Sequence, residues 1–331
     1  MRFGVSILLV FGVTLVTFTL ANLVPADPVS AALGERAASD PTVVAAFRKA
    51  QGLDKPVVTQ YVLYVGRLLR GNLGVSTQTH NPVTKDLGVA FPATAELALF
   101  VIVFSIIIGI GFGMIAALRR NRLSDQVIRV LSLIGISIPT FWLALVVFFV
   151  FFYKLHWAPG TGRLDPAAIA PPTVTGMYTV DSLLAGQWST FFNALAHLML
   201  PVTVLTLYTV GLLTRFSRSA VLDVLGQDYV LAAHAKGLSF RAVVFRYTLR
   251  GASLPILTIV GLAFGSLLSG TVLTEQVFGW GGIGQYAYKA ATTLDLPAVM
   301  GVGLTVGLVY ILTNFVIDVI YGIIDPRVRV Q

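Results

Sequence analysis

The sequence lacks features on which much enzyme chemistry depends. It contains no cysteine, which excludes disulfide bonds and thiolate metal sites. The dipeptide Gly-Lys never occurs, so the phosphate-binding loop of nucleotide hydrolases is absent. No Ser/His/Asp grouping stands out, and the four histidines are scattered without metal-ligand spacing: His80, His156, His197 and His234. We therefore expect a non-catalytic chain that holds no metal and hydrolyses no ATP itself.

Charge is also scarce. Only 11% of the 331 residues are charged and 56% are hydrophobic, whereas an ordinary soluble domain is about 25% charged. Most of the chain is therefore predicted to lie in lipid. The net charge of +8 does not indicate nucleic acid as a partner, because the basic residues flank hydrophobic segments, where they usually set orientation in the bilayer.

The apolar stretches predict an all-α integral membrane protein. A spanning helix needs about 20 mostly apolar residues, and six stretches meet this length: about 3–24, 94–118, 127–153, 194–214, 252–274 and 298–320. The first could instead be a signal peptide. It is longer than the roughly 7–15 apolar residues of such a peptide, and no clean A-x-A site follows it, which favours an uncleaved membrane anchor.

Basic residues gather on one side of these six spans. They are Arg2, Arg119, Arg120, Arg122, Arg129, Arg215, Arg218, Lys236, Arg241, Arg246, Arg250, Arg327 and Arg329. The short loops on the opposite side carry only Lys154, Arg163 and Lys289. Because cytoplasmic loops are enriched in lysine and arginine, we expect both termini in the cytoplasm.

The long segment after the first span is predicted to be helical and extracytoplasmic. Asp40-Pro41 and Gly52 are typical of the start and end of a short helix. A second helix opens at Asp54 and Pro56 and ends at Gly71. Its apolar residues recur at helical spacing: Val58, Tyr61, Val65 and Leu68. This stripe packs either on the membrane surface, on the chain's own spans, or on a partner outside the membrane.

Ionisable residues are almost absent from the middle of the spans. Glu96 and Glu275 lie near the outer ends of two spans, and Asp318 lies near the inner end of the last. Proton- and ion-coupled transporters keep such groups at membrane depth. We therefore expect these to be interfacial or capped carboxylates, with a proton relay as the alternative.

Small residues and prolines interrupt several spans. Gly-x-x-x-Gly pairs occur at Gly109/Gly113, Gly261/Gly265 and Gly303/Gly307, and they permit close helix contact within one subunit or between two. Pro139 and Pro201 are predicted kinks, either fixed by packing or part of a moving gate.

A basic loop on the cytoplasmic side has the pattern of two short helices. Asp228 is a good N-cap, and Lys236-Gly237 would end the first helix about two turns later. Ser239 would cap a second helix that runs to Arg250, with Gly251 and Pro255 beyond it. In that helix one apolar face repeats at i, i+3, i+4 and i+7: Phe240, Val243, Val244 and Tyr247.

This loop could simply carry the arginines that set topology. That interpretation does not explain the helix caps or the small residues of Ala232-Ala233-His234-Ala235. Since a helix of two turns is unstable alone in water, it must pack on something. A docking element for a cytoplasmic partner accounts for both features. We predict as docking residues Asp228, Tyr229, Ala232, Ala233, His234, Ala235, Lys236, Gly237 and Leu238.

The run Leu231-Ala232-Ala233 followed by Gly237 resembles the cytoplasmic loop of permease subunits of binding-protein-dependent ABC importers. "AKGL" at 235–238 resembles the dipeptide, oligopeptide and nickel branch in particular. The sequence departs from the family pattern at three positions. Leu231 replaces the usual acidic first residue, His234 stands where that branch often has arginine, and Gly251 stands where it often has asparagine. Further matches cover nearly the whole chain: "NLVPADP", "QGLDKPVVTQYVLYVGRLLRGNLGVS", "FPATAELAL", "ISIPTFWLAL", "TEQVFGWGGIGQYAYKAATTLDLPAV" and "YGIIDPRVR".

The resemblance implies a type I importer permease in a bacterial cytoplasmic membrane. Residues 1–93 would form the first span and the extracytoplasmic segment, 94–322 the permease core with a coupling loop at about 215–251, and 323–331 a cytoplasmic tail. Implied partners are a second homologous permease, two ATPase subunits that hold ATP and magnesium, and an extracytoplasmic solute-binding protein. A possible outer gate lies between the last two spans: Glu275, Phe278, Trp280, Gly282 and Gly284.

The resemblance leaves the cargo open. Di- or oligopeptides are favoured, with nickel, glutathione or haem carried by the same machinery as alternatives. A stand-alone channel or secondary transporter is the alternative class, but it would need polar groups along the spans, and few are present.

Overall fold

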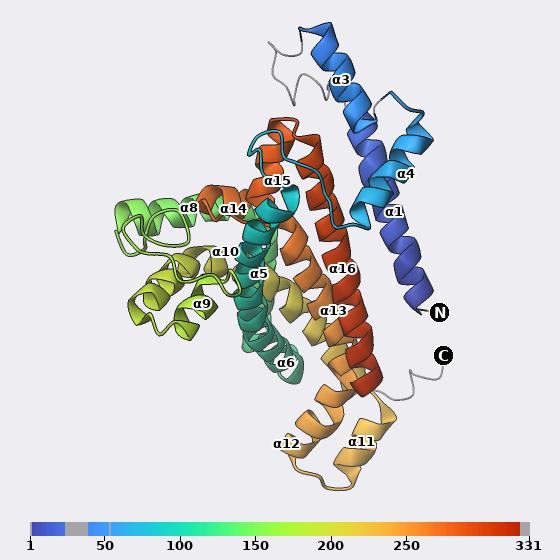
Figure 1. The fold of residues 1–331 in the computed structure, drawn as a ribbon. Helices are drawn as coiled ribbons and strands as arrows, with labels where there is room; N and C mark the ends of the chain where they lie inside the picture. The colour runs from blue at the N-terminus through green and yellow to red at the C-terminus, as the bar shows by residue number, and fades with distance from the viewer. Residues whose placement is uncertain (1, 24–38, 53, 325–331) are drawn as a thin grey trace. The chain divides into compact units, whose positions relative to one another are not determined.

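The computed structural model describes residues 2–23, 39–52 and 54–324. These residues contain no β-strand, only a single bridge between Val75 and Pro82. The predicted all-α fold is confirmed (Figure 1). The chain divides into two compact units, Met1–Thr94 with Gly281–Leu312, and Ala95–Trp280 with Thr313–Gln331.

The first unit draws helices from both ends of the sequence. They are α1 (Arg2–Leu23), α3 (Pro41–Gln51), α4 (Val57–Leu68), the first part of α5 (Val83–Ser105), α15 (Ile283–Thr292) and most of α16 (Leu296–Ile324). α3 begins and ends as predicted. Asp40 accepts a hydrogen bond from the N–H of Thr42, and Gly52 adopts the left-handed conformation at φ +71°.

α4 packs on α1 through aromatic rings. Tyr61 lies edge-on to Phe11 and Phe18, and its hydroxyl is 2.9 Å from that of Thr14. Tyr64, which the predicted stripe omits, is buried and stacks on Phe18. Part of the apolar face of α4 is therefore covered by the chain's own first helix.

The core of the first unit joins α5 to α15 and α16. Its buried members are Val83, Leu87, Ala90, Ile283, Ala290, Ala298 and Val302. A polar contact adds to it, because the hydroxyl of Ser76 donates to the buried carboxylate of Asp295 at 2.5 Å. That bond holds the segment after α4 against the turn that opens α16.

The second unit is built around one long helix, α10 (Trp188–Leu225). The other elements are η1 (Ile106–Ile110), α6 (Gly111–Leu118), α7 (Leu123–Ser137), α8 (Thr140–Phe148), η2 (Phe149–Lys154), α9 (Tyr178–Leu184), α11 (Asp228–Ala235), α12 (Phe240–Ala242), η3 (Val243–Thr248), α13 (Leu249–Gly270) and α14 (Val272–Phe278). α6, α7, α8, α9 and α13 all contact α10.

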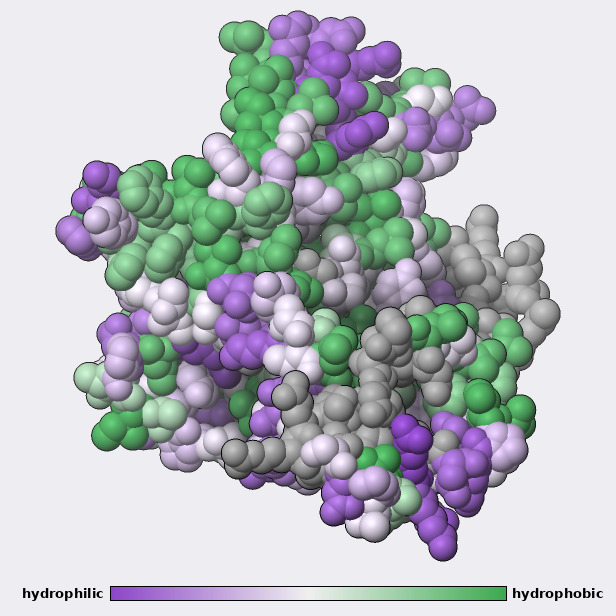
Figure 2. All heavy atoms as spheres, turned by 90° about the horizontal axis from the view of Figure 1, so that it is seen from above, coloured by the Kyte–Doolittle hydropathy of each residue, from purple (hydrophilic) through white to green (hydrophobic). Residues whose placement is uncertain are grey.

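Four helices of the described residues are long and apolar enough to cross a membrane: Val83–Leu118, Trp188–Leu225, Phe240–Ser269 and Leu296–Ile323. They agree with four of the six predicted spans. The first predicted span coincides with α1, of which Leu8–Thr19 forms a shorter apolar helix. Large hydrophobic side chains remain exposed, and Figure 2 shows hydrophobic residues over broad areas of the surface. Because only four helices, or five if the bent pair counts as one span, pass the length and composition test among the described residues, the count of six spans is not confirmed.

The third predicted span, 127–153, is not one helix. α7 and the helix formed by α8 and η2 are bent by 93° at a short break. At that break Ile138 is extended (φ −83°, ψ 123°) and Pro139 precedes α8. Proline disfavours the helical conformation of the residue before it, so Pro139 produces a break and not the predicted kink. Pro201, by contrast, lies inside the unbroken α10.

The predicted glycine pairs make contacts within the chain. A Cβ on Gly109 or Gly113 would lie 2.7 Å from the Cβ of Leu213 or Ser217 on α10. In the first unit, Gly307 of α16 meets Val13 of α1 in the same way, at 2.6 Å. Small residues therefore bring helix backbones of one subunit close together.

A buried ion pair fixes α7 to α10. Asp125 is fully buried and accepts two hydrogen bonds from Arg218, at 2.8 and 2.9 Å, and a third from the N–H of Asn121. The sequence predicted Arg218 only as part of the basic side of the membrane. Its structural partner was missed because the two residues are far apart along the chain.

Two glycines on α6 offer a matched test of this packing. Gly113→Ala should destabilise the protein by about 1–3 kcal/mol, because the new methyl would meet the backbone of α10 at about 3.0 Å as well as Ser217. Gly111→Ala should be neutral or stabilise by up to about 1 kcal/mol, since nothing lies within 4 Å of its Cβ. The apparent Tm of each purified variant would be measured in detergent and compared with that of the wild type. Equal Tm shifts for the two variants would contradict the close packing of Gly113 on α10.

Candidate functional site

The basic loop folds as a helical hairpin, with α11 beside α12 and η3 (Figure 1). α11 begins one residue earlier than predicted, because Gln227 is its N-cap and Asp228 already belongs to the helix. Asp228 therefore does not cap the helix. It lies in the first turn, where its negative charge interacts favourably with the helix dipole. Gly237 ends the turn after α11 as predicted, at φ +73°.

A small apolar cluster holds the hairpin together. Val230 and Ala233 of α11 are buried against Val243 of η3, with Val224 and Tyr247 packed around them. Exposed fractions of 0%, 3% and 1% for Val230, Ala233 and Val243 show that these side chains are fully covered. The short helix α11 cannot be stable alone, and it is stabilised by packing on the following helix of the same chain.

The opposite face of α11 is open. Eight of the predicted docking residues are exposed: Asp228, Tyr229, Ala232, His234, Ala235, Lys236, Gly237 and Leu238. Ala233 is the ninth, and its inward position means that it supports the hairpin and offers no docking surface. Leu231, which the prediction omitted, is 56% exposed on the open face. We call Leu231, Ala232 and Ala235 the outer face of α11.

The second helix of the hairpin does not end near Arg250. Ser239 caps it by accepting from the N–H of Ala242, as predicted, but the helix then continues through η3 into α13 as one stretch, Phe240–Ser269. Gly251 lies inside this helix, where a Cβ would collide with the hydroxyl of Tyr229. The glycine permits a close approach of α11 and does not terminate a helix. Hairpin and span are thus continuous.

The predicted gate residues of the second unit are buried and tightly packed. Glu275 is fully buried and accepts a 2.8 Å hydrogen bond from Thr271. Phe278 packs edge-on to Phe148, and Trp280, 1% exposed, follows the left-handed Gly279 that ends α14.

The remaining predicted gate residues belong to the first unit. Gly282 is the N-cap residue of α15, and Gly284 is buried within its first turn. Between them, the N–H of Ile283 donates to Thr94 at 2.8 Å. These contacts anchor the start of α15, and a gating role stays a prediction.

Glu96 is a paired carboxylate. It is 2.7 Å from Arg163 and also accepts from the N–H and hydroxyl of Thr179. The guanidinium of Arg163 stacks 3.7 Å from the centre of the Tyr178 ring. These bonds tie the loop before α9 to α5, in agreement with the predicted capped carboxylate.

Asp181 organises the same loop. Burial acts to raise the pKa of its carboxyl, but hydrogen bonds from the backbone and hydroxyl of Thr175 and from the N–H groups of Gly176 and Val174 hold the pKa below its usual range. The carboxylate therefore stays charged. Its hydrogen bonds hold residues 174–176, which belong to no helix or strand, in place.

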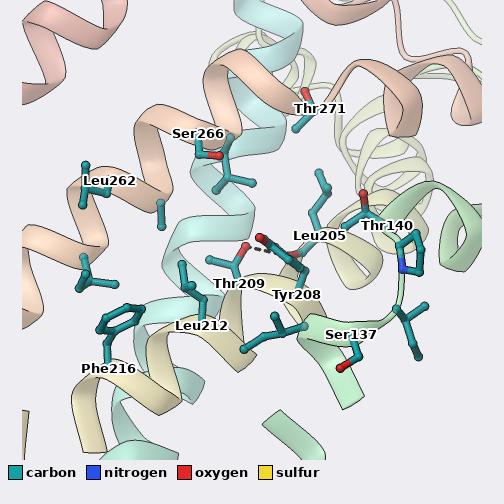
Figure 3. Close-up of a pocket in the computed structure, with 16 residues that line it drawn as sticks. Ser137, Thr140, Leu205, Tyr208, Thr209, Leu212, Phe216, Leu262, Ser266 and Thr271 are labelled. Atoms are coloured by element: carbon teal, nitrogen blue, oxygen red, sulfur yellow. Dashed lines mark hydrogen bonds between the residues drawn. The ribbon is translucent and has the colours of Figure 1, made fainter. Parts of the chain in front are cut away.

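A pocket of about 590 Å³ opens where α7 breaks from α8. Figure 3 shows its labelled side chains, which come from both sides of the break and from α10 and α13. The sequence did not predict it, since its polar members are isolated hydroxyls: Ser137, Thr140, Tyr208, Thr209, Ser266 and Thr271. None of the sixteen lining residues carries a charge.

Comparison with known proteins finds family matches along nearly the whole sequence. A family model described as "Binding-protein-dependent transport system inner membrane component" matches residues 109–330, and a model for the N-terminal part of such components matches residues 1–98. The chain belongs to this permease family. The matched core contains the hairpin, the pocket and α10.

Relatives within the permease family are similar over nearly their full length. The di/tripeptide permease protein DppB of Pseudomonas aeruginosa is 44% identical, covering 100% of this chain and 98% of its own. The probable D,D-dipeptide permease protein DdpB of Escherichia coli is 42% identical over 97% and 94%. The methionine ABC transporter MetNI in an inward-facing state has a TM-score of 0.53 at 16% identity, covering 72% of this chain and 96% of its own, which shows the shared fold.

The Glu96–Arg163 pair predicts a specific stability difference. Arg163→Ala should cost about 3 kcal/mol, because it leaves the buried carboxylate of Glu96 without its ionic partner. Lys154→Ala is the control. This exposed lysine lies over the Phe149 and Tyr153 rings, and its loss should cost less than about 1 kcal/mol. Thermal unfolding in detergent measures both, and similar Tm values for the two variants would refute a structural role for the pair.

Proposed function

We propose that the chain is the transmembrane permease subunit of an ATP-driven ABC importer and forms half of a translocation pathway for di- and oligopeptides. The observation that carries this proposal is full-length similarity, 36–44% identical, to permeases named for dipeptide transport. The absence of charged residues from the lining of the pocket supports it, because an ion-coupled transporter would need ionisable groups at that depth.

The hairpin is proposed as the coupling element. Its outer face is apolar, small and exposed, which suits a groove on an ATPase subunit. Its inner face is packed on the helix that continues as α13. A push on α11 by closing ATPase subunits would therefore be passed through this packing to a membrane span. This chain supplies no catalytic group, and ATP and magnesium would be held by the partners.

The same proposal specifies the assembly. Two homologous permeases would lie side by side in a bacterial cytoplasmic membrane, with two ATPase subunits on the cytoplasmic side and a solute-binding protein outside. Both termini would be cytoplasmic. The basic side chains Arg241, Arg246 and Arg250, all exposed on the hairpin helix, support this orientation by the positive-inside rule.

Glutamate substitutions on the outer face should uncouple the transporter. Ala232→Glu and Ala235→Glu place a charge where an apolar contact is proposed, so uptake should fall at least about tenfold while the protein still reaches the membrane. The control is Ala167→Glu, at an exposed alanine outside the hairpin, which should leave uptake unchanged. Uptake and ATP hydrolysis would be measured together in reconstituted vesicles. Wild-type uptake by both outer-face variants would argue against docking there.

Substitution of the buried alanine should act differently. Ala233→Glu would force a charge into the Val230–Val243 cluster, so it should loosen the hairpin itself and expose the loop to proteolysis in the isolated chain. The outer-face variants should leave that digestion pattern unaltered.

Cargo is tested with the complete transporter and its cognate binding protein. Labelled dipeptides should be accumulated in an ATP-dependent manner, and labelled nickel should not. Accumulation of nickel alone would replace the peptide assignment with the nickel alternative but would keep the importer mechanism.

A further inference from the structure

The pocket at the α7–α8 break lies within the length of the predicted spans. Its lining residues on α10 run from Leu205 to Phe216, within the predicted 194–214 span and just beyond it. Those on α13 run from Ile259 to Leu267, the middle of the predicted 252–274 span. A site at this depth would be buried in hydrocarbon if it were not enclosed by protein or water.

Two helix ends, and with them backbone polar groups, lie at the break beside the pocket. The N–H of Ile138 bonds the carbonyl of Ile134, but the carbonyl groups that follow in α7 and the first N–H groups of α8 have no partner within their own helices. Ser137, Ile138, Pro139 and Thr140 all line the cavity. No side chain caps α8. Irregular backbone at membrane depth is tolerated only where it is buried in protein or lines a water-filled cavity. Such interrupted helices supply donors and acceptors to a solute in many transporters.

Free hydroxyl groups complete the lining. Within the described residues, the side chains of Ser137, Thr140, Tyr208 and Ser266 make no hydrogen bond to one another or to other groups. Thr209 donates to the carbonyl of Leu205 in its own helix and keeps acceptor capacity. Figure 3 shows Tyr208 and Thr209 on α10 and Ser266 on α13 around the same space. The pocket therefore offers donors and acceptors without charge.

These properties fit one chemical class of ligand. A peptide group has one donor and one acceptor and no net charge, so hydroxyls and free backbone groups can bind it whatever side chains flank it. The volume of about 590 Å³ lies in the range of small-molecule sites and leaves room for water around a dipeptide. Without a charged partner the binding is weak, as passage through a pathway requires.

We propose that this pocket is a transient binding site for the backbone peptide group of the passing substrate. The inference rests on the proposed function and extends it, since it assigns to this subunit a site of its own in addition to that of the binding protein. Selection by side-chain charge is left to the binding protein, because the pocket has no charge with which to select.

A charge placed in the pocket should create the selectivity that the native lining lacks. In the complete transporter, initial uptake rates would be measured for labelled Ala-Ala, Lys-Ala and Glu-Ala, each at a concentration that saturates the binding protein. Ser266→Asp should raise the ratio of Lys-Ala to Glu-Ala uptake about tenfold, and Ser266→Lys should lower it by a similar factor, because like charges repel and opposite charges attract over a few ångströms. Ser137→Asp should act in the same direction as Ser266→Asp from the other side of the pocket.

The control is Ser269→Asp. Ser269 is an exposed serine on the same helix, outside the pocket lining. The ratio of Lys-Ala to Glu-Ala uptake by this variant should therefore stay at the wild-type value. The proposal is overturned if the Ser266 and Ser137 variants reach the membrane, import Ala-Ala and keep the wild-type ratio, or if Ser269→Asp shifts the ratio as much as they do. A wild-type transporter that imports none of the three dipeptides would instead refute the proposed function, and this inference with it.

Discussion

Contact between Val230, Ala233 and Val243 is the interaction on which the proposed mechanism depends. It turns a two-turn helix, unstable by itself, into a rigid projection on a membrane span. Because Phe240–Ser269 is one helix, a displacement of α11 would act directly on the helix that forms a predicted span. In the proposed mechanism, the exposed outer face of α11 contacts a partner and the buried inner face transfers force.

Charge is placed where it can be paired, away from the middle of the spans. Asp125 binds Arg218 between α7 and α10, and Glu96 binds Arg163 between α5 and the loop before α9. The pocket is lined by hydroxyl and apolar side chains alone. The two pairs fix helix positions, and neither lies in the pocket. The pocket of this chain thus offers no ionisable group for a proton or ion relay, in keeping with the proposal that partner subunits supply the energy.

The sequence predicted those features that depend on local chemistry. Asp40, Pro41 and Gly52 bounded α3 correctly, and Gly237 and Ser239 separated the hairpin helices, since caps act within one turn. It failed where long-range contacts decide. Gly251 was taken as a helix end, yet it makes room for Tyr229, and Ala233 was taken as a docking residue, yet it packs on Val243. Apolar composition alone could not distinguish one span from two helices bent at Pro139.

The absence of cysteine permits a direct measurement of the central claim, which is that the outer face of α11 is covered by a partner in the assembled transporter. A single cysteine at Ala235→Cys would be labelled with a thiol reagent in membranes that contain this chain with and without the ATPase subunits. The account predicts rapid labelling without the ATPases and strong protection with them, while a cysteine at exposed Ala167 reacts equally in both. Equal labelling of position 235 in the two membranes would contradict it.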